Sequence, residues 1–313
     1  MPATSANPPI TTYLDDRRAL VDRALRDALP GARTPSVLRE AVTYSVMAGG
    51  KRIRPILALA ACDAVGGDSR RIVPLVVSLE FVHTYSLIHD DLPAMDDDDL
   101  RRGRPTNHRV FGEDMAILAG DALQAMAFAA LSDARDPDDI PAAVRLAAVA
   151  ELAAASGAEG LAGGQALDLR ADAPPAAAPA DEAARAAALA TLDDIHARKT
   201  GALIRAAVRM GAILGGATEA RLLALTRYGE AVGLLFQIAD DVLDVEATAE
   251  EMGKATGKDR DRHKWAYPAV IGVAASREIA EACVRDAIEA LSGFSEAADP
   301  LRGVARYILD RRS

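Results

Sequence analysis

Two clusters of aspartate, about half a chain apart, are the residues of this sequence best suited to chemistry. Each cluster holds three acids in a largely apolar stretch: Asp90, Asp91 and Asp96 in the first, and Asp240, Asp241 and Asp244 in the second. Carboxylates are costly to bury unless something neutralises their charge. Mg²⁺ takes oxygen ligands, keeps several waters and often binds through one or two carboxylates together with phosphates. The clusters therefore predict a site for magnesium and a diphosphate between two helices.

The second cluster has the more regular geometry. At about 100° per residue, Gln237 and the three acids fall within roughly a 100° arc of one helix. Apolar residues occupy the opposite side: Leu234, Leu235, Ile238, Val242 and Val245. A solvated surface is the plain alternative for an acidic face. However, no Lys or Arg is interspersed along the flanks, where a surface helix usually carries some, so the pattern favours a ligand-binding face.

The first cluster lies at the end of a predicted helix. Pro93 disfavours helix at the residue before it, so the helix should end near Asp91, with Asp96 returning from a short loop. Acids are poorly placed at a helix C-terminus because the macrodipole is negative there. A bound cation would offset this penalty.

Basic side chains that could bind phosphate oxygens lie near the acids in sequence or spacing. They form four groups: Lys51 and Arg54 in the run 49–55, Arg101 and Arg102 in the run 101–104, Lys199 beside Thr200, and Lys254, Lys258 and Lys264 in one loop. Arginine forks suit phosphate oxygens, and lysine acts as a point charge. The run 49–55 is not a nucleotide-binding P-loop, which needs Gly at position 45 and Ser or Thr after the lysine. Scattered surface charge is the alternative for each group, but a diphosphate carried on magnesium needs both signs of charge.

These motifs resemble, in order, those of the short-chain trans-polyprenyl diphosphate synthases, in particular the bacterial farnesyl and geranylgeranyl diphosphate synthases. The matching runs are residues 49–55, 89–106, 163–169, 199–201, 237–244 and 253–268. The resemblance implies an all-α, single-domain, isoprenoid-synthase-like bundle around a deep central cavity. It also implies a head-to-tail condensation of isopentenyl diphosphate with dimethylallyl or geranyl diphosphate, by ionisation, condensation and proton elimination. Several Mg²⁺ ions are the implied cofactor, with Mn²⁺ as the alternative.

The resemblance further implies a role for each matching residue. The metal ligands are the six acids of the two clusters, of which Asp241 in particular has water-mediated binding as its alternative. The implied catalytic residues are Asp90, Asp240, Lys199, Thr200 and Gln237, with the oxygen dipoles of the last two facing the carbocation. The implied ligands of the allylic diphosphate are Arg101, Lys199, Lys254, Lys258 and Lys264. Isopentenyl diphosphate would be bound without metal by Lys51, Arg54, His83 and Arg102.

Three further polar residues have competing interpretations. His83 lies seven residues, about two helical turns, before Asp90 and shares a helix face with it. A lone histidine on a helix is more often structural, but this position and the motif around it favour binding. Gln165 and Asp168 either support the site or are polar residues of the core, and the sequence favours neither.

Product length is assigned to Tyr85 and Ser86. At 1.5 Å per residue they lie roughly 7.5 and 6 Å below Asp90. In the family, bulky residues about one turn before the first motif form a floor under the growing tail, and an aromatic residue at the position of Tyr85 matches bacterial farnesyl synthases. An ideal helix points Tyr85 about 140° away from Asp90, so this assignment rests on the resemblance. We predict farnesyl diphosphate as the product, with geranylgeranyl diphosphate as the alternative.

Composition favours a mostly helical chain. Half of the 313 residues are hydrophobic and only 4% are aromatic, and the abundance of alanine favours helix. We predict disorder over 1–12 and one catalytic domain over 13–313, because a split at the midpoint would divide the motif series. Helices are predicted at 13–29, 36–48, 54–65, 70–91, 113–132, 142–157, 180–196, 199–214, 218–233, 234–246, 265–274, 276–292 and 298–311.

Other classes of protein are less consistent with this sequence. The net charge of −10 argues against nucleic-acid binding, and Cys62 and Cys283 give no disulfide framework. No signal segment or uninterrupted apolar span of about 18 residues is visible, so we predict a cytoplasmic protein without a membrane span. The resemblance implies a homodimer. A class I terpene cyclase and a non-catalytic subunit of a heteromeric synthase remain as rivals; the second aspartate motif and the Lys51/Arg54 pair argue against the former, and the intact acids and Lys199 argue against the latter.

Overall fold

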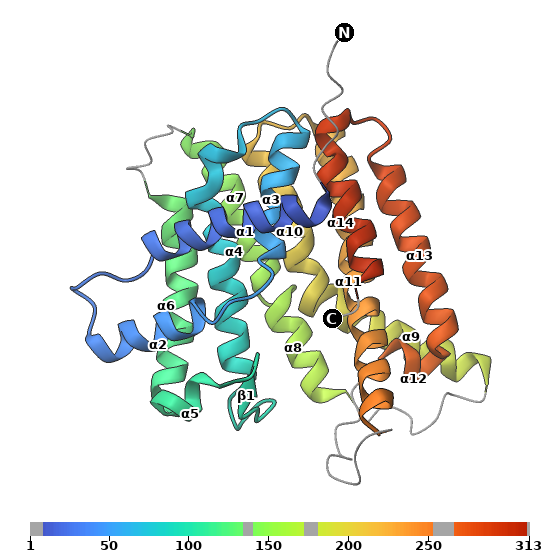
Figure 1. The fold of residues 1–313 in the computed structure, drawn as a ribbon, viewed down its shortest axis with the longest axis horizontal. Helices are drawn as coiled ribbons and strands as arrows, with labels where there is room; N and C mark the ends of the chain where they lie inside the picture. The colour runs from blue at the N-terminus through green and yellow to red at the C-terminus, as the bar shows by residue number, and fades with distance from the viewer. Residues whose placement is uncertain (1–8, 134–139, 172–180, 253–265, 312–313) are drawn as a thin grey trace. The chain divides into compact units, whose positions relative to one another are not determined.

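The computed structural model describes residues 9–133, 140–171, 181–252 and 266–311, and these are almost entirely helical (Figure 1). The predicted all-α fold is confirmed. The chain forms two compact units, one of residues 1–152 and 207–218 and the other of residues 153–206 and 219–313. A single catalytic domain with a central cavity stays a prediction.

The first unit is built around α4 (Ser69–Asp90). Its other elements are α1 (Ile10–Asp27), α2 (Ser36–Val46), α3 (Ile53–Ala64), α5 (Asn107–Phe111), α6 (Glu113–Ser132) and the strands β1 (Leu100–Arg101) and β2 (Arg104–Pro105). Helix α4 packs against α1, α2, α3 and α6, and apolar residues on all its sides, such as Leu75, Val77 and Leu79, are buried. Asp68 caps its start by accepting a hydrogen bond from Arg70 N at 3.1 Å. The helix ends at Asp90, as Pro93 predicted.

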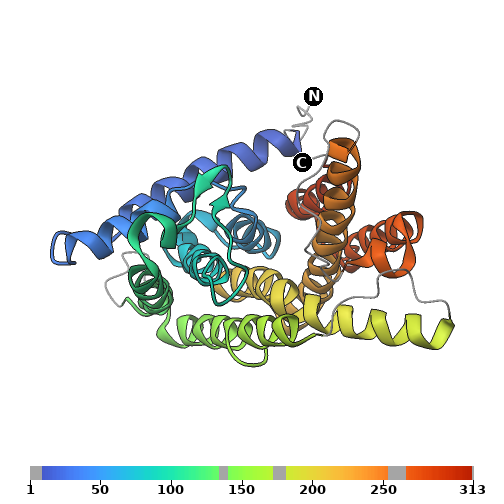
Figure 2. The same cartoon turned by 90° about the horizontal axis from the view of Figure 1, so that it is seen from below.

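The second unit is built around the long helix α11 (Glu219–Met252). Around it lie α8 (Leu161–Arg170), α9 (Glu182–His196), the π-helical segment η1 (Ala197–Gly201), α12 (Tyr267–Ile271), α13 (Val273–Ala290), the short 3₁₀ segment η2 (Glu296–Ala298) and α14 (Asp299–Asp310). Helices α13 and α14 pack along α11 (Figure 2). Helices α7 (Ala142–Ser156) and α10 (Ala202–Leu214) each contain a boundary between the two units.

Several elements differ from the prediction. Helix α1 begins at Ile10, with Pro9 as its N-cap, so residues 10–12 are helical rather than disordered; residues 1–8 of the predicted disordered segment lie outside the described residues. Helix α11 is continuous where two helices were predicted. Helix α8 and the hairpin β1–β2 were not predicted at all. Adjacent glycines obscured α8, and strands of two residues are too short to show alternation.

Among the residues that the structure describes, three helices are long and apolar enough to cross a membrane by length and composition alone. They are α4, α6 and the part of α11 from Glu219 to Glu246. In α4, 78% of the most apolar window is buried inside the protein, whereas in α6 only 33% is buried. The hydropathy of α4 therefore has an explanation within the fold, and α6 has an apolar surface that the described part of the chain does not cover.

Candidate active site

Arg52 holds the run 49–55 against the rest of the first unit. From the sequence, this residue could be identified only as a member of a basic run. Arg52 has a left-handed backbone (φ 52°) and is 3% exposed. Its guanidinium donates to Asp22 at 2.9 Å, to Glu80 on α4 at 3.0 Å and to the carbonyl of Val46 at 2.7 Å. This network fixes the start of α3. Arg54 lies in the first turn of that helix, and the exposed Lys51 lies just before it.

The hairpin β1–β2 brings Arg102 to the same loop. Its two-residue turn, Arg102 and Gly103, has positive φ at both positions (53° and 71°), as a type I′ hairpin turn requires. Such a backbone is uncommon for arginine. Arg102 donates to the carbonyl of Gly49, and a Cβ on Gly50 would lie 2.6 Å from its Nη1. A residue larger than glycine at position 50 would therefore displace this arginine.

His83, on α4, lies in the field of these arginines. Burial lowers the pKa of His83 well below its usual value, and the charges of Arg54 and Arg102 lower it further. The pKa of Arg102 is also lowered by burial; the charge of Glu80 opposes this shift, and the charges of Arg52 and Arg101 add to it. The structure thus brings three of the four predicted isopentenyl diphosphate ligands into one strongly positive environment, which suits an anion.

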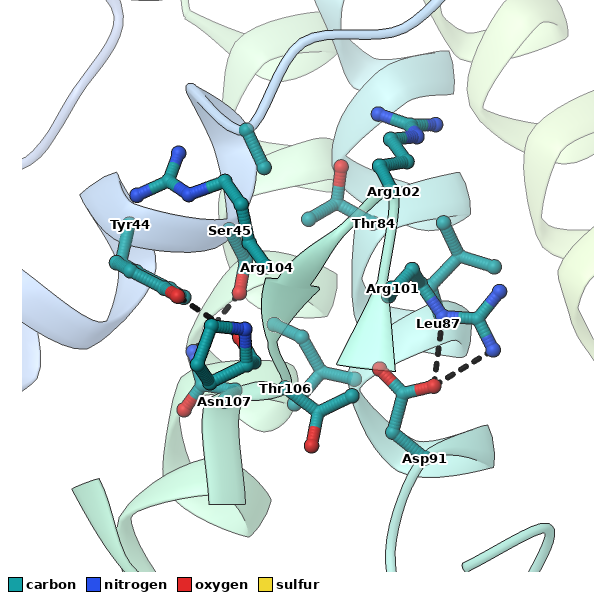
Figure 3. Close-up of a pocket in the computed structure, with 13 residues that line it drawn as sticks. Tyr44, Ser45, Thr84, Leu87, Asp91, Arg101, Arg102, Arg104, Thr106 and Asn107 are labelled. Atoms are coloured by element: carbon teal, nitrogen blue, oxygen red, sulfur yellow. Dashed lines mark hydrogen bonds and ion pairs between the residues drawn. The ribbon is translucent and has the colours of Figure 1, made fainter. Parts of the chain in front are cut away.

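Asp91 and Arg101 bind each other. Both Nε and Nη2 of Arg101 lie 2.6 Å from Oδ1 of Asp91, in a pocket where Arg102 points away from this pair (Figure 3). Asp91 is buried, and burial raises its pKa although Arg101 opposes the rise. The sequence assigned Asp91 to metal and Arg101 to the allylic diphosphate. Here each is already partly neutralised by the other.

Tyr85 is buried on α4, against α6. Its ring lies edge-on to His89 with centroids 5.9 Å apart, and its hydroxyl is hydrogen-bonded to Gln124 of α6. Burial, followed by the charge of Asp90, raises its pKa. Ser86 turns back on its own helix, with its hydroxyl donating to the carbonyl of His83 at 3.0 Å. Tyr85 is therefore held rigidly, and Ser86 does not project as a bulky group.

In the second unit, Lys199 and Thr200 lie in the π-helical segment η1. Segments of this type are rare and often occur at functional sites. Close contact with two helices requires glycine: a Cβ on Gly164 of α8 would lie 2.3 Å from Lys199 N, and one on Gly233 of α11 would lie 2.9 Å from the Cα of Gly201. Lys199 Nζ lies 2.6 Å from Oδ2 of Asp168 on α8. Asp168, left open by the sequence, is thus the partner of Lys199.

A chain of hydrogen bonds runs from Thr200 to α12. The Thr200 hydroxyl donates to Gln237 Oε1 at 3.0 Å, Gln237 Nε2 donates to Asp241 Oδ1 at 2.9 Å, and the backbone N–H of Tyr267 donates to Asp241 Oδ2 at 3.0 Å. Burial raises the pKa of Asp241 to about 6, partly offset by these hydrogen bonds. Tyr267 is held in turn by a hydrogen bond from its hydroxyl to Asp193 of α9. Sequence reasoning missed Tyr267 and Asp193, since neither lies beside the acids along the chain.

Asp240 is paired with Arg311, just past the end of α14. Arg311 Nη2 lies 2.5 Å from Asp240 Oδ1 and donates to the carbonyl of Phe236 at 3.1 Å. Its guanidinium stacks 4.3 Å from the centre of the Phe236 ring. The Arg311 side chain is 4% exposed and that of Asp240 is 43% exposed. No signal in the sequence linked the two, because they are 71 residues apart.

The carboxylates of the two motifs are suitable ligands for a hard divalent cation, although neither motif supplies enough ligands to hold an ion without help. In the described part of the chain, no group of three or more His, Cys, Asp or Glu residues could hold an ion alone. Carboxylate oxygens are nevertheless the donors that Mg²⁺ uses, and one or two per motif are sufficient when a substrate diphosphate supplies the others. The exposed Asp244 and the half-buried Asp90 and Asp240 fit such a site better than the buried Asp91 and Asp241.

The predicted residues fall into two groups. Those of the first unit are Lys51, Arg54, His83, Tyr85, Ser86, Asp90, Asp91, Asp96, Arg101 and Arg102, and those of the second are Lys199, Thr200, Gln237, Asp240, Asp241 and Asp244. Lys254, Lys258 and Lys264 lie outside the described residues. The predicted arrangement of two acidic helices facing each other stays a prediction.

Comparison with known proteins assigns these motifs to a family. Residues 35–299 match the family model described as polyprenyl synthetase. The chain belongs to the polyprenyl synthetase family. It is accordingly a prenyltransferase of the trans-prenyl diphosphate synthase class, with the all-α fold of these enzymes.

Members of the polyprenyl synthetase family resemble the chain along nearly its whole length. It is 44% identical to the heterodimeric geranylgeranyl pyrophosphate synthase large subunit 1 of Arabidopsis thaliana, with 96% of this chain and 79% of that protein covered. It is 43% identical to the geranylgeranyl diphosphate synthase of Cyanophora paradoxa, with 97% of each covered. Among solved structures, an FPP/GFPP synthase from Zymomonas mobilis is 39% identical with a TM-score of 0.79, covering 96% of this chain and 98% of its own. The names of these relatives agree on the class and differ on the product.

Proposed function

We propose that the protein condenses isopentenyl diphosphate with dimethylallyl and geranyl diphosphate to make farnesyl diphosphate. The observation that carries the choice of product is Tyr85, a buried aromatic side chain fixed between α4 and α6 about one helical turn before the first acidic motif. A rigid ring at this depth would stop a growing tail. The class of reaction is supported by family membership, and the roles of the site residues are supported by their geometry and by the motif resemblance.

Isopentenyl diphosphate is assigned to the positive environment of the first unit. Arg54, Arg102 and the exposed Lys51 would neutralise its phosphates without a metal, and His83 would donate a hydrogen bond to them. His83, whose pKa is lowered, is neutral at neutral pH and donates through one ring nitrogen only. The backbone contacts that hold Arg102 to Gly49 and Gly50 would position its guanidinium before substrate binds.

The allylic diphosphate is assigned to Lys199 and Arg101, with Lys254, Lys258 and Lys264 as proposed additions. When bound to the acids, Mg²⁺, or Mn²⁺ in its place, would supply positive charge to the departing diphosphate. Asp90, Asp96, Asp240 and Asp244 are the proposed ligands, and Asp91 is proposed to act through its pair with Arg101. Asp168 holds Lys199 in place until a phosphate oxygen replaces it.

The proposed reaction breaks the allylic C–O bond, so that diphosphate leaves with the electron pair and an allylic cation remains. The double bond of isopentenyl diphosphate attacks this cation, and a new C–C bond forms. The resulting cation loses a proton to the released diphosphate. The oxygen dipoles of Thr200 and Gln237 are proposed to stabilise the positive charge in the first step, as prearranged dipoles do in other enzymes.

Product sizing tests this proposal. The purified protein is incubated with labelled isopentenyl diphosphate and each of dimethylallyl, geranyl and farnesyl diphosphate, and the products are sized by mass. We expect fifteen-carbon product from wild type, twenty-carbon or longer product from Tyr85→Ala, and unchanged length from the control Tyr85→Phe, which keeps the ring. Twenty-carbon product from wild type would favour a geranylgeranyl synthase, the activity named for the Cyanophora relative. Hydrocarbon released from farnesyl diphosphate alone would instead indicate a terpene cyclase.

A homodimer is the assembly we propose. The apolar helix α6 leaves Ile117 and Leu118 about half exposed, and Leu146 of α7 is exposed as well. Exposed apolar surface of this kind is typical of protein–protein contacts. Location in the cytoplasm remains a prediction from the sequence.

A further inference from the structure

We propose that Asp241 is a positioning residue that sets the direction of the hydrogen bonds between Gln237 and Thr200, and that it is not a ligand of a metal ion. The inference rests on the proposed function, because it concerns how Thr200 meets the allylic cation. It separates Asp241 from Asp240 and Asp244, with which it shares a sequence motif.

The Asp241 carboxylate has both oxygens engaged within the protein. Oδ1 accepts from Gln237 at 2.9 Å and Oδ2 accepts from the backbone N–H of Tyr267 at 3.0 Å. The residue is 7% exposed. Each oxygen keeps a second lone pair, but a cation bound there would have to share an oxygen that already holds a buried donor, on a carboxylate with little access to solvent.

The carboxylate determines which way the Gln237 amide faces. An ionised carboxylate only accepts hydrogen bonds, so Gln237 must turn its NH₂ group toward Asp241. Its carbonyl oxygen then faces Thr200, and the Thr200 hydroxyl must donate to it, at 3.0 Å. The hydroxyl proton of Thr200 is therefore committed to Gln237. Only lone pairs of Thr200 Oγ remain for a third group, which is the polarity that stabilises a neighbouring positive charge.

The substitution Asp241→Asn should reverse this direction without disturbing packing. The backbone N–H of Tyr267 requires an oxygen, so the new amide side chain would turn its NH₂ group toward Gln237. Gln237 would then flip to present its own oxygen to that NH₂ group and its NH₂ group to Thr200. Thr200 would become the acceptor, and its O–H would point outward with the positive end toward the cation. Every group keeps a partner, so the fold should be retained.

The first experiment compares Asp241→Asn with Asp240→Asn. For Asp241→Asn we expect a kcat lower by on the order of 100-fold, the scale typical of the loss of one prearranged dipole. Its KM for both substrates and its Mn²⁺ affinity, measured from the electron paramagnetic resonance signal of free Mn²⁺, should stay within about twofold of wild type. Asp240→Asn should weaken Mn²⁺ binding. Gln237→Met, which leaves Asp241 in place, removes the oxygen that accepts from Thr200 and should lose at least as much kcat as Asp241→Asn.

The second experiment restores the original hydrogen-bond direction by moving the negative charge from position 241 to position 237. When Asp241→Asn is combined with Gln237→Glu, the new amide donates to one oxygen of the new carboxylate, and the other oxygen accepts from Thr200 as in wild type. The net charge is that of wild type. We expect this double variant to turn over about tenfold faster than Asp241→Asn alone, which corresponds to about 1.4 kcal/mol.

The inference is overturned if Asp241→Asn weakens Mn²⁺ binding as much as Asp240→Asn, if it turns over at the wild-type rate, or if the added Gln237→Glu brings no recovery. Thermal melts show whether each variant is folded, and a wild-type kcat in a folded Gln237→Met would overturn the inference even if Asp241→Asn does not fold. A wild-type protein that forms no prenyl diphosphate at all would instead refute the proposed function. The two failures are therefore distinguishable.

Discussion

Arg311 occupies the carboxylate that we assign as a leading metal ligand, so removing it should strengthen metal binding. Its Nη2 contacts Asp240 Oδ1 at 2.5 Å, and a metal ion using this oxygen must compete with the guanidinium. A hydrogen bond to a charged group contributes about 1.5–3 kcal/mol net. Because the Asp240 side chain is 43% exposed, the lower end applies, and about 1.4 kcal/mol corresponds to a tenfold change in affinity.

The test is the substitution Arg311→Leu, which keeps apolar contact with the Phe236 ring while removing the charge. We expect Mn²⁺ affinity to rise about tenfold, measured from the paramagnetic resonance signal of free Mn²⁺ in the presence of inorganic diphosphate. The matched control Arg311→Lys keeps a competing cation and should change the affinity far less. An unchanged or weaker affinity in Arg311→Leu would refute the reasoning, because it would mean that Arg311 supports Asp240 as a ligand and does not compete with the metal.

Two further predictions concern stability and assembly. Burial lowers the pKa of His196 to about 4 from 6.5, so the unfolded chain binds the proton more tightly and stability should fall by up to about 3 kcal/mol as pH drops from about 6.5 to 4. Urea denaturation across this range should show a smaller loss for His196→Phe, and parallel curves for the two proteins would contradict the assignment. Light scattering should find wild type as a dimer and Ile117→Asp with Leu118→Asp as a monomer that retains its helical circular dichroism. A dimer in that double variant would exclude this face of α6 as the interface.

Sequence patterns predicted the features that depend on neighbouring residues, such as the fold class and the ends of helices. The composition indicated the all-α fold, and Pro93 indicated that the helix ends near Asp91, one residue from the observed end of α4 at Asp90. The motif order led to the family that the comparisons then identified. The pattern of apolar residues on α11 was correct for Leu235, Ile238 and Val242, which are buried, and wrong for Val245, which is 40% exposed.

Contacts between distant segments were beyond such patterns. Asp91 and Asp241 look equivalent to their motif neighbours in the sequence, yet each is buried and held by partners that the fold supplies. A linear motif reports which residue types are present, and burial decides which of them remain accessible to an ion. For the same reason the sequence could not indicate that Arg311 would meet Asp240.

The π-helical segment η1 also bears on how this chain tolerates changes in length. Its consecutive residues Lys199 and Thr200 reach different helices, with Asp168 on α8 and Gln237 on α11. A π-helical turn holds one residue more than an α-helical turn, so deleting one residue between Ala197 and Gly201 would tighten this turn into an α-helical one and move Lys199 and Thr200 away from both partners. A library of single-residue deletions should therefore show a sharp gap in function at η1, whereas the alanine-rich, exposed start of α9 can lose one residue from its helix end.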